Sequence, residues 1–309
     1  MAIAPARAST LQRIPLQIRR AWEDARSPAA LIALGLGAAV AYAAFASGAI
    51  ELPMEARLQV GVAALSLLSF AALLFAKPMR VSATTAGWAG LALLALFAIW
   101  TGATIAWSIA PDATWTELNR TLAYTLVAAI ALTIGSSLPR AAERAAKGYL
   151  LVAVVVAAYA LGGKAIPGVH IGPLDFNHTA FFSRLRAPLA YWNALSLFCV
   201  LAVPVAIQAA AKPGQGRRAR AAAVVALALL LTTIGLTYSR GGVAALAVVV
   251  LVLLAAGPDR LRTAAVAAAG VIGAAPALAV GFTRPHLTHD LVPLSQRTGD
   301  GLMFAAALA

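Results

Sequence analysis

Charged side chains are scarce in this sequence. Lys, Arg, Asp and Glu make up 11% of its 309 residues, whereas about a quarter of the residues in a soluble globular domain are charged. This scarcity excludes an ordinary water-soluble domain. Acids are the rarer sign, with 11 acidic against 24 basic residues and a formal net charge of +13.

Cysteine is nearly absent, and no cluster of metal-ligating residues stands out. The single cysteine, Cys199, sits inside an apolar run, so the chain has no disulfide framework and we expect this thiol to pack in the interior. No acidic pair has the character of a metal site, and we expect neither a metal nor a cofactor. His286 and His289 have the spacing of one helical face, typical of a metal ligand pair or a general base, but Pro285 and polar neighbours favour a solvated loop. No short apolar stretch ends at a small-residue cleavage site, so no removable signal peptide is expected.

Long uncharged apolar runs fill the rest of the sequence. Hydrophobic residues account for 61% of the chain, its mean hydropathy is +0.85, and one helical crossing of a bilayer needs roughly 20 apolar residues. The sequence therefore predicts an all-α, polytopic transmembrane helix bundle of about nine complete spans within residues 28–309. The predicted spans are 29–50, 58–76, 87–107, 118–135, 147–166, 187–211, 221–238, 242–256 and 263–282.

The two ends of the chain differ from these spans. Residues 1–27 are basic, and two interpretations stay open for them: an amphipathic helix on the membrane surface, or a loose basic tail. Residues 301–309 are apolar but reach only about half the length of a crossing. We expect them to begin a tenth span, so that the membrane domain is cut short and the chain is the N-terminal portion of a longer protein.

The basic residues indicate an orientation. If each span crosses once and the N-terminus is cytoplasmic, sixteen of the 24 Lys and Arg lie on the inner side and eight on the outer side. This position in short connectors argues against nucleic acid as a partner. Seven of the 11 acids and all four histidines fall in the outer connectors, so we expect any chemistry on the outer side.

A polar stretch, Thr237–Gly242, is wedged between two apolar runs with hardly any loop. It reads Thr-Tyr-Ser-Arg-Gly-Gly and places Arg240 at the outer interface. A buried arginine costs at least ~2.5–3.5 kcal/mol on insertion scales, and such residues usually face a bundle interior or a water-filled cavity; snorkelling to the headgroups is the alternative. Gly241 and Gly242 favour function, because glycine permits a tight turn and the close approach of a ligand. The planar guanidinium suits a phosphate, such as a lipid-linked diphosphate.

A second polar stretch, 182–194, leads from an outer connector into the sixth predicted span. Tyr191 and Trp192 are typical of the aromatic belt at a membrane interface. Asn193 lies inside that span and needs a polar partner within the bundle. A role in joining helices and a role in binding substrate both stay open for Asn193.

These two stretches together resemble the O-antigen ligase/polymerase family of bacterial membrane glycosyltransferases. Residues 184–194 read R-L-x-x-P-x-x-Y-x-N-A, and T-Y-S-R-G-G follows at 237–242. Segments 106–120 and 292–301 also look like parts of family members, so the resemblance spreads over residues 100–301. Ala187 and Ala190 depart from the glycines common in relatives. The family's functional histidine is expected beyond residue 309, so we expect residues 1–309 alone to be inactive.

The resemblance implies a GT-C-like enzyme of the bacterial inner membrane. Such an enzyme moves a glycan from an undecaprenyl-diphosphate carrier to an acceptor on the outer face, as a ligase or a polymerase. The matching arginine, Arg240, is expected to act catalytically by holding the diphosphate. The residues expected to bind substrate are Arg184, Arg186, Asn193, Ser239, Gly241 and Arg297. A transporter or flippase for a lipid-linked or anionic solute is the alternative, since it would use the same interfacial arginines without chemistry, and a non-catalytic membrane scaffold is a third interpretation.

Overall fold

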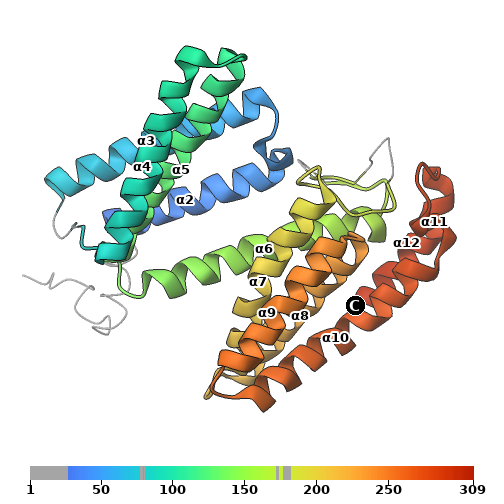
Figure 1. Cartoon of the computed structure of the whole chain (residues 1–309). Coiled ribbons are helices and arrows are strands. Elements are labelled where there is room, and N and C mark those ends of the chain that lie inside the picture. The colour runs from blue at the N-terminus through green and yellow to red at the C-terminus, as the bar shows by residue number, and fades with distance from the viewer. Residues whose placement is uncertain (1–26, 77–78, 80, 172–173, 177–181) are drawn as a thin grey trace, which may run out of the picture. The chain divides into compact units, whose positions relative to one another are not determined.

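The chain folds almost entirely into helices (Figure 1). The computed structural model describes residues 27–76, 79, 81–171, 174–176 and 182–309. The basic N-terminal segment, for which two interpretations stay open, lies outside these residues except for Ser27. The long helices are α2 (Pro28–Phe45), α3 (Leu52–Phe75), α4 (Thr85–Thr104), α5 (Pro111–Ser137), α6 (Ala141–Ala165), α7 (Trp192–Ala211), α8 (Arg217–Leu236), α9 (Arg240–Ala256) and α10 (Arg260–Thr283).

Shorter elements connect or follow these helices. Two 3-10 turns, η2 (Ser47–Ala49) and η3 (Ile105–Trp107), follow α2 and α4. A two-residue hairpin of β1 (His170–Ile171) and β2 (Leu174–Asp175) pairs antiparallel after α6. The chain then ends with α11 (Pro285–Thr288) and α12 (Leu294–Leu308).

Eight helices in the described part of the chain are long and apolar enough to cross a membrane, which confirms a multi-pass helical protein. They are α2 to α8 and α10, with α4 continued by η3. Helices suit the bilayer because they satisfy all their backbone hydrogen bonds internally. The remaining predicted span is α9, an apolar helix of 17 residues. The total of nine crossings stays a prediction.

Several helices begin at other residues than the sequence predicted, and α3, α5 and α6 begin earlier, at Leu52, Pro111 and Ala141 instead of residues 58, 118 and 147. Two further differences concern the segments around the candidate site. The sixth span begins at Trp192 instead of residue 187, because Pro188 donates no backbone hydrogen bond and Ala190 has a left-handed φ of 62°. The last helix begins at Leu294 instead of residue 301, so Arg297 lies in a helix and not in a loop.

The chain divides into two compact units. The first comprises residues 1–38 and 59–141, and its buried apolar cluster joins the start of α2 to the second half of α5. Ser136 holds the segment before α4 through two hydrogen bonds with the backbone of Ser82, at 2.9 and 2.7 Å. Thr84 then caps α4 by accepting a bond from the amide of Gly87.

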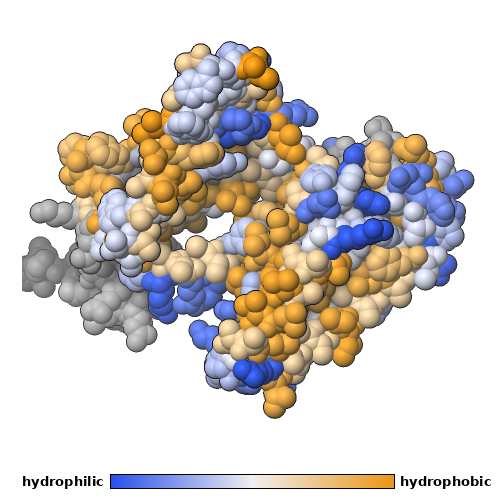
Figure 2. Space-filling model, in the orientation of Figure 1, coloured by the Kyte–Doolittle hydropathy of each residue, from blue (hydrophilic) through white to orange (hydrophobic). Residues whose placement is uncertain are grey.

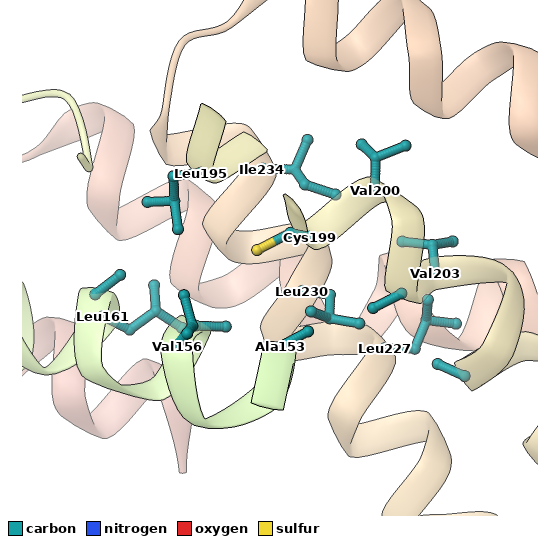
Figure 3. Close-up of a cluster of buried hydrophobic side chains, with 14 of the residues drawn as sticks. Ala153, Val156, Leu161, Leu195, Cys199, Val200, Val203, Leu227, Leu230 and Ile234 are labelled. Carbon is teal, nitrogen blue, oxygen red and sulfur yellow. The ribbon is translucent and has the colours of Figure 1, made fainter. Parts of the chain in front are cut away.

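The second unit comprises residues 39–58 and 142–309 and contains the larger core. In Figure 3, Val156 and Leu161 of α6 face side chains of α7 and α8. Cys199 is buried in this core, which confirms its predicted packing role. Pro204 in α7 and Pro276 in α10 lie inside helices, which membrane helices tolerate because neighbouring groups satisfy the freed carbonyls.

Candidate functional site

One group of polar residues of the second unit lies where α6 ends and the last connections begin. Figure 2 shows hydrophilic surface over the α6–α7 connection and around α11, beside hydrophobic surface along the helices of this unit. The segments that meet there are the α6 end, residues 182–191, the α8–α9 junction and α10–α12. They contain six of the seven residues proposed from the sequence, and Asn193 follows directly at the start of α7.

The Tyr-Ser-Arg-Gly-Gly stretch forms a tight junction between α8 and α9. Tyr238 makes the turn with a left-handed φ of 53°, so the turn does not depend on the two glycines. Ser239 caps α9, because its hydroxyl accepts a hydrogen bond of 3.0 Å from the amide of Gly242. Ser239 is only 3% exposed. The cap therefore belongs to the interior of the bundle.

Asn193 joins this cap to the start of α7. Its amide oxygen accepts a hydrogen bond of 2.8 Å from the Ser239 hydroxyl, and its amide nitrogen donates to the Tyr191 hydroxyl at 2.6 Å. Of the two roles left open for Asn193, the structure shows the joining of helices. Because Asn193 itself is exposed, its role in binding substrate stays a prediction.

The two glycines of the motif have different surroundings. A Cβ atom at Gly242 would overlap the Ser196 hydroxyl of α7 and lie 2.8 Å from the Ser196 Cβ. The space beside Gly242 is therefore filled by the close packing of α9 on α7, and no ligand approaches there. Gly241 is exposed, and a Cβ atom at this position would meet no other atom within 4 Å. The open backbone expected from the sequence is therefore at Gly241.

Arg240 is the first residue of α9 and is exposed. Its side chain makes no hydrogen bond or ion pair with any of the residues that the structure describes. The guanidinium thus stands at a helix N-terminus, where the backbone amides already favour an anion. Its predicted role in holding a diphosphate stays a prediction.

Arg184 and Arg186 both stack on aromatic rings. The guanidinium carbon of Arg184 lies 5.3 Å from the centre of the Trp192 ring, and that of Arg186 lies 3.6 Å from the centre of the Phe182 ring. Such cation–π contacts orient a guanidinium over the ring and leave its N–H donors available for hydrogen bonds. The aromatic belt residue Trp192 therefore also positions a cation.

An open cavity of about 360 Å³ lies beside Arg184. Its lining residues come from the segment before α7, the α8–α9 junction, the end of α10 and α11. They are Ser183, Arg184, Tyr238, Phe282 and Thr288. Arg240 is not among them, although Tyr238 lies two residues before it. We call this cavity the rim pocket.

Two buried cations lie next to this region. Lys164, in the last turn of α6, is 1% exposed, and its ammonium donates a hydrogen bond of 2.7 Å to the carbonyl of Leu287 in α11. Arg297 of α12 is 3% exposed and interacts electrostatically with Lys164. Buried like charges are costly unless polar groups or anions compensate them. In the sequence, Lys164 looks like one more connector charge, and the one signal that sets it apart is its position at the end of an otherwise uncharged run.

Helix α12 meets α6 closely at Gly301. A Cβ atom there would lie 2.8 Å from the carbonyl oxygen of Lys164 and 3.2 Å from that of Ala165. These oxygens belong to the backbone and cannot rotate away. Gly301 thus allows α12 to approach α6, and this approach brings Arg297 beside Lys164.

Asp290 connects the buried cations to the rim pocket. Its carboxylate accepts a hydrogen bond of 2.7 Å from the Ser183 amide, and it interacts electrostatically with Lys164 and Arg184. The hydrogen bonds from Ser183 hold the pKa of Asp290 below its usual value, with Arg184 and Lys164 acting in the same direction. Asp290 is therefore ionised at neutral pH.

His286 and His289 lie on α11 and the residue after it, where the sequence favoured a solvated loop. His286 contacts Asp300 of α12 through its Nδ1 atom at 3.0 Å, whereas His289 Nδ1 lies 2.8 Å from the Pro285 carbonyl oxygen. Within the described ranges no three His, Cys, Asp or Glu side chains are placed to hold a metal ion. The His286–Asp300 contact instead joins α11 to α12.

The structure brings together some of the predicted residues. Arg184 interacts with Asp290, Arg297 interacts with Lys164, and Asn193 bonds Ser239. No contact in the described part links Arg240 to these groups. The chain matches no family model, no curated protein and no solved structure.

Proposed function

We propose that this chain is a membrane glycosyltransferase of the O-antigen ligase/polymerase type, working in the bacterial inner membrane with a cytoplasmic N-terminus. It transfers a glycan from an undecaprenyl-diphosphate carrier to an acceptor on the outer face. The observation that carries the proposal is a connected group of charges beside an open pocket, at one end of a membrane helix bundle. Asp290 interacts with Lys164 and Arg184, and Lys164 also interacts with Arg297.

The reaction builds up negative charge on its leaving group, and cations at the membrane surface can stabilise that charge. An acceptor hydroxyl oxygen attacks the anomeric carbon of the donor sugar, and the bond from that carbon to the diphosphate oxygen breaks. The diphosphate keeps the electron pair, and the hydroxyl proton passes to a base or to water. Fixed cations in a site with little water stabilise the negative charge that grows on this leaving group.

Arg240 has the position that suits the leaving group. It is exposed at the N-terminus of α9, and the cap Ser239 and its partner Asn193 fix the backbone that carries it. A guanidinium pairs bidentately with a phosphate, and the helix N-terminus adds attraction for an anion. Arg184, Arg186 and Arg297 supply further positive charge near the carrier lipid, and Gly241 leaves the backbone beside Arg240 open.

A transfer assay tests the proposal against transport. The full-length protein is reconstituted in liposomes with a radiolabelled undecaprenyl-diphosphate oligosaccharide and an acceptor glycan. We expect label to move to the acceptor, with release of undecaprenyl diphosphate. If the labelled donor only changes leaflet, with no glycosidic bond formed, the protein is a flippase and the proposal is wrong.

Arg240→Lys is the matched substitution within that assay. It keeps the charge but removes the bidentate fork, so we expect loss of at least about two orders of magnitude in transfer, comparable to removing one oxyanion donor. Arg217→Lys is the control, because Arg217 also begins a helix but lies at the other end of α8. Full activity in Arg240→Lys would remove Arg240 from the site.

A further inference from the structure

The rim pocket combines an aromatic wall with hydroxyl groups. Tyr238 and Phe282 meet edge to face, with ring centres 5.4 Å apart and an angle of 71° between the ring planes. Ser183 and Thr288 add hydroxyls, and Arg184 adds one guanidinium. A volume of about 360 Å³ is at the lower end of the range for small-molecule sites, about 300–1,000 Å³. The pocket therefore suits a ligand the size of one small ring.

The mixture of groups indicates which kind of ring. An aromatic face is electron-rich and attracts the polarised C–H face of a ring that is not itself aromatic. The hydroxyls of Tyr238, Ser183 and Thr288 both donate and accept hydrogen bonds, and the guanidinium only donates. A pyranose has one C–H face and a perimeter of hydroxyls, which matches this arrangement.

The charges in and around the rim pocket favour the binding of a neutral ring over an acidic one. Arg184 is the one cation that lines the pocket in the described part of the chain, and it interacts with the ionised Asp290. Lys164 and Arg297 are almost fully buried and do not line the pocket. Asp290 does not line the pocket, but its carboxylate interacts with Arg184 and accepts a hydrogen bond from Ser183, which both line it. It therefore offsets the charge of Arg184 and would repel a sugar carboxylate bound in the pocket.

We infer that the rim pocket binds the pyranose ring of an uncharged sugar, packed on Tyr238 and Phe282 with its hydroxyls toward Arg184, whose charge Asp290 offsets. The inference rests on the proposed function for its source, a ring of the lipid-linked donor or of the acceptor glycan. Tyr238 in the pocket wall is two residues along the chain from Arg240, where a carrier diphosphate is proposed.

Binding of simple glycosides tests this without any transfer step. The protein in lipid nanodiscs is mixed with methyl β-glucoside or methyl β-glucuronide, which differ only in the C6 carboxylate, and saturation transfer from protein to sugar protons is measured by NMR. We expect transfer to the ring C–H protons of the glucoside and binding of the glucuronide at least about tenfold weaker, a difference of about 1.4 kcal/mol. Absence of transfer to the glucoside, or preference for the glucuronide, would overturn the inference.

Two variants locate the signal. Phe282→Leu removes one of the two rings of the aromatic wall and should strongly weaken transfer to the glucoside, whereas Phe97→Leu changes another exposed phenylalanine, on α4, and should leave it unchanged. Asp290→Asn should bring the two glycosides to similar affinity. Equal signals in Phe282→Leu and wild type would place the sugar elsewhere.

The source of the ring and the two proposals are separable. In the transfer assay, a bound glucoside should compete with the donor if the ring belongs to the donor, and with the acceptor otherwise. Glycoside binding without any glycan transfer would support the sugar site in the rim pocket and contradict the proposed enzyme. Glycan transfer without glycoside binding would do the reverse.

Discussion

The two units of this protein contrast in how much interior they have. In the first unit, α4 has 6% of its most apolar 18-residue window buried, and α5 has 22%. In the second unit the corresponding values are 50% for α7 and 44% for α8. Helices of similar hydropathy therefore present mostly outward side chains in one unit and an enclosed core in the other.

Polar side chains follow the same division. In the first unit most serine and threonine hydroxyls donate to carbonyls of their own helix, as Thr101 and Thr125 do. The Ser136–Ser82 pair joins separate segments at an exposed position of the first unit, whereas in the second unit such links include the buried Lys164–Leu287 bond and the part-buried Ser239–Asn193 bond. Buried polar contacts between helices are costly to lose and specify one arrangement. The proposed site lies in the unit that has these links.

We expect the largest loss of stability from a substitution that places an extra methyl group in a close contact between two helices. Gly301→Ala places a methyl group against backbone oxygens of α6, so we expect a loss of about 3 kcal/mol of stability. Gly299→Ala in the same helix and Gly90→Ala in α4 meet no atom within 4 Å and should gain up to about 1 kcal/mol. Thermal unfolding in detergent measures all three. Equal melting temperatures for Gly301→Ala and Gly299→Ala would contradict the close contact of α12 with α6.

A smaller effect is expected from the buried ammonium group. Lys164→Met leaves the Leu287 carbonyl without this donor but relieves repulsion from Arg297, so we expect a net loss of about 2 kcal/mol. Lys147→Met removes an exposed lysine of the same helix, paired with Glu143, and should change stability by less than about 0.5 kcal/mol. Chemical denaturation of both variants measures these changes in the free energy of unfolding. A Lys164→Met protein as stable as wild type would show that the contact is not structural.

The stability contributed by one helix cap can be compared directly between the two units. Ser239→Ala removes the cap of α9 and the bond to Asn193, so we expect a loss of about 1–2 kcal/mol. Thr84→Ala removes the cap of α4, which is exposed and has no second partner among the described residues, and should cost about 0.5–1 kcal/mol. Equal losses in thermal unfolding would mean that the Asn193 bond adds nothing.

The smallest effect concerns acid. Because the folded pKa of Asp290 is lowered, its carboxylate contributes stability above the ordinary aspartate pKa of about 4, and this contribution disappears as pH falls through the folded pKa. Asp290→Asn should therefore be less stable than wild type at neutral pH and converge with it in acid. Glu117→Gln breaks an exposed pair with Arg120 in the first unit and should change stability by a few tenths of a kcal/mol at any pH. Melting temperatures measured across the acid range test both.

The sequence was a good guide to the spans and a poorer one to the site. Apolar runs about 20 residues long predict membrane helices because the bilayer fixes their length, and α2 to α8 and α10 follow that expectation. The helix starts expected at residues 187 and 301 lie at Trp192 and Leu294 in the structure, since a polar or proline-containing segment can belong to a helix or precede it. That choice depends on tertiary packing, such as the fit of Gly301 against α6.

Contacts between distant segments account for the rest. Arg184, Asn193 and Ser239 were found from their motifs, and the structure adds the bond between the last two. The buried Lys164 and the anchoring of Asp290 by Ser183 involve residues 123 and 107 positions from their partners. No local pattern reports such pairs, and their polar side chains look like ordinary connector residues until the fold places them.

The Lys164–Leu287 bond also has a consequence for synthesis of the protein. The ammonium and its carbonyl partner are 123 residues apart, so α6 enters the bilayer well before α11 exists. During that interval water or lipid headgroups must solvate the ammonium, which the end position of Lys164 on α6 permits by snorkelling. Completion of α10 and α11 then withdraws the charge from the interface, so the second unit closes around Lys164 late in its biogenesis.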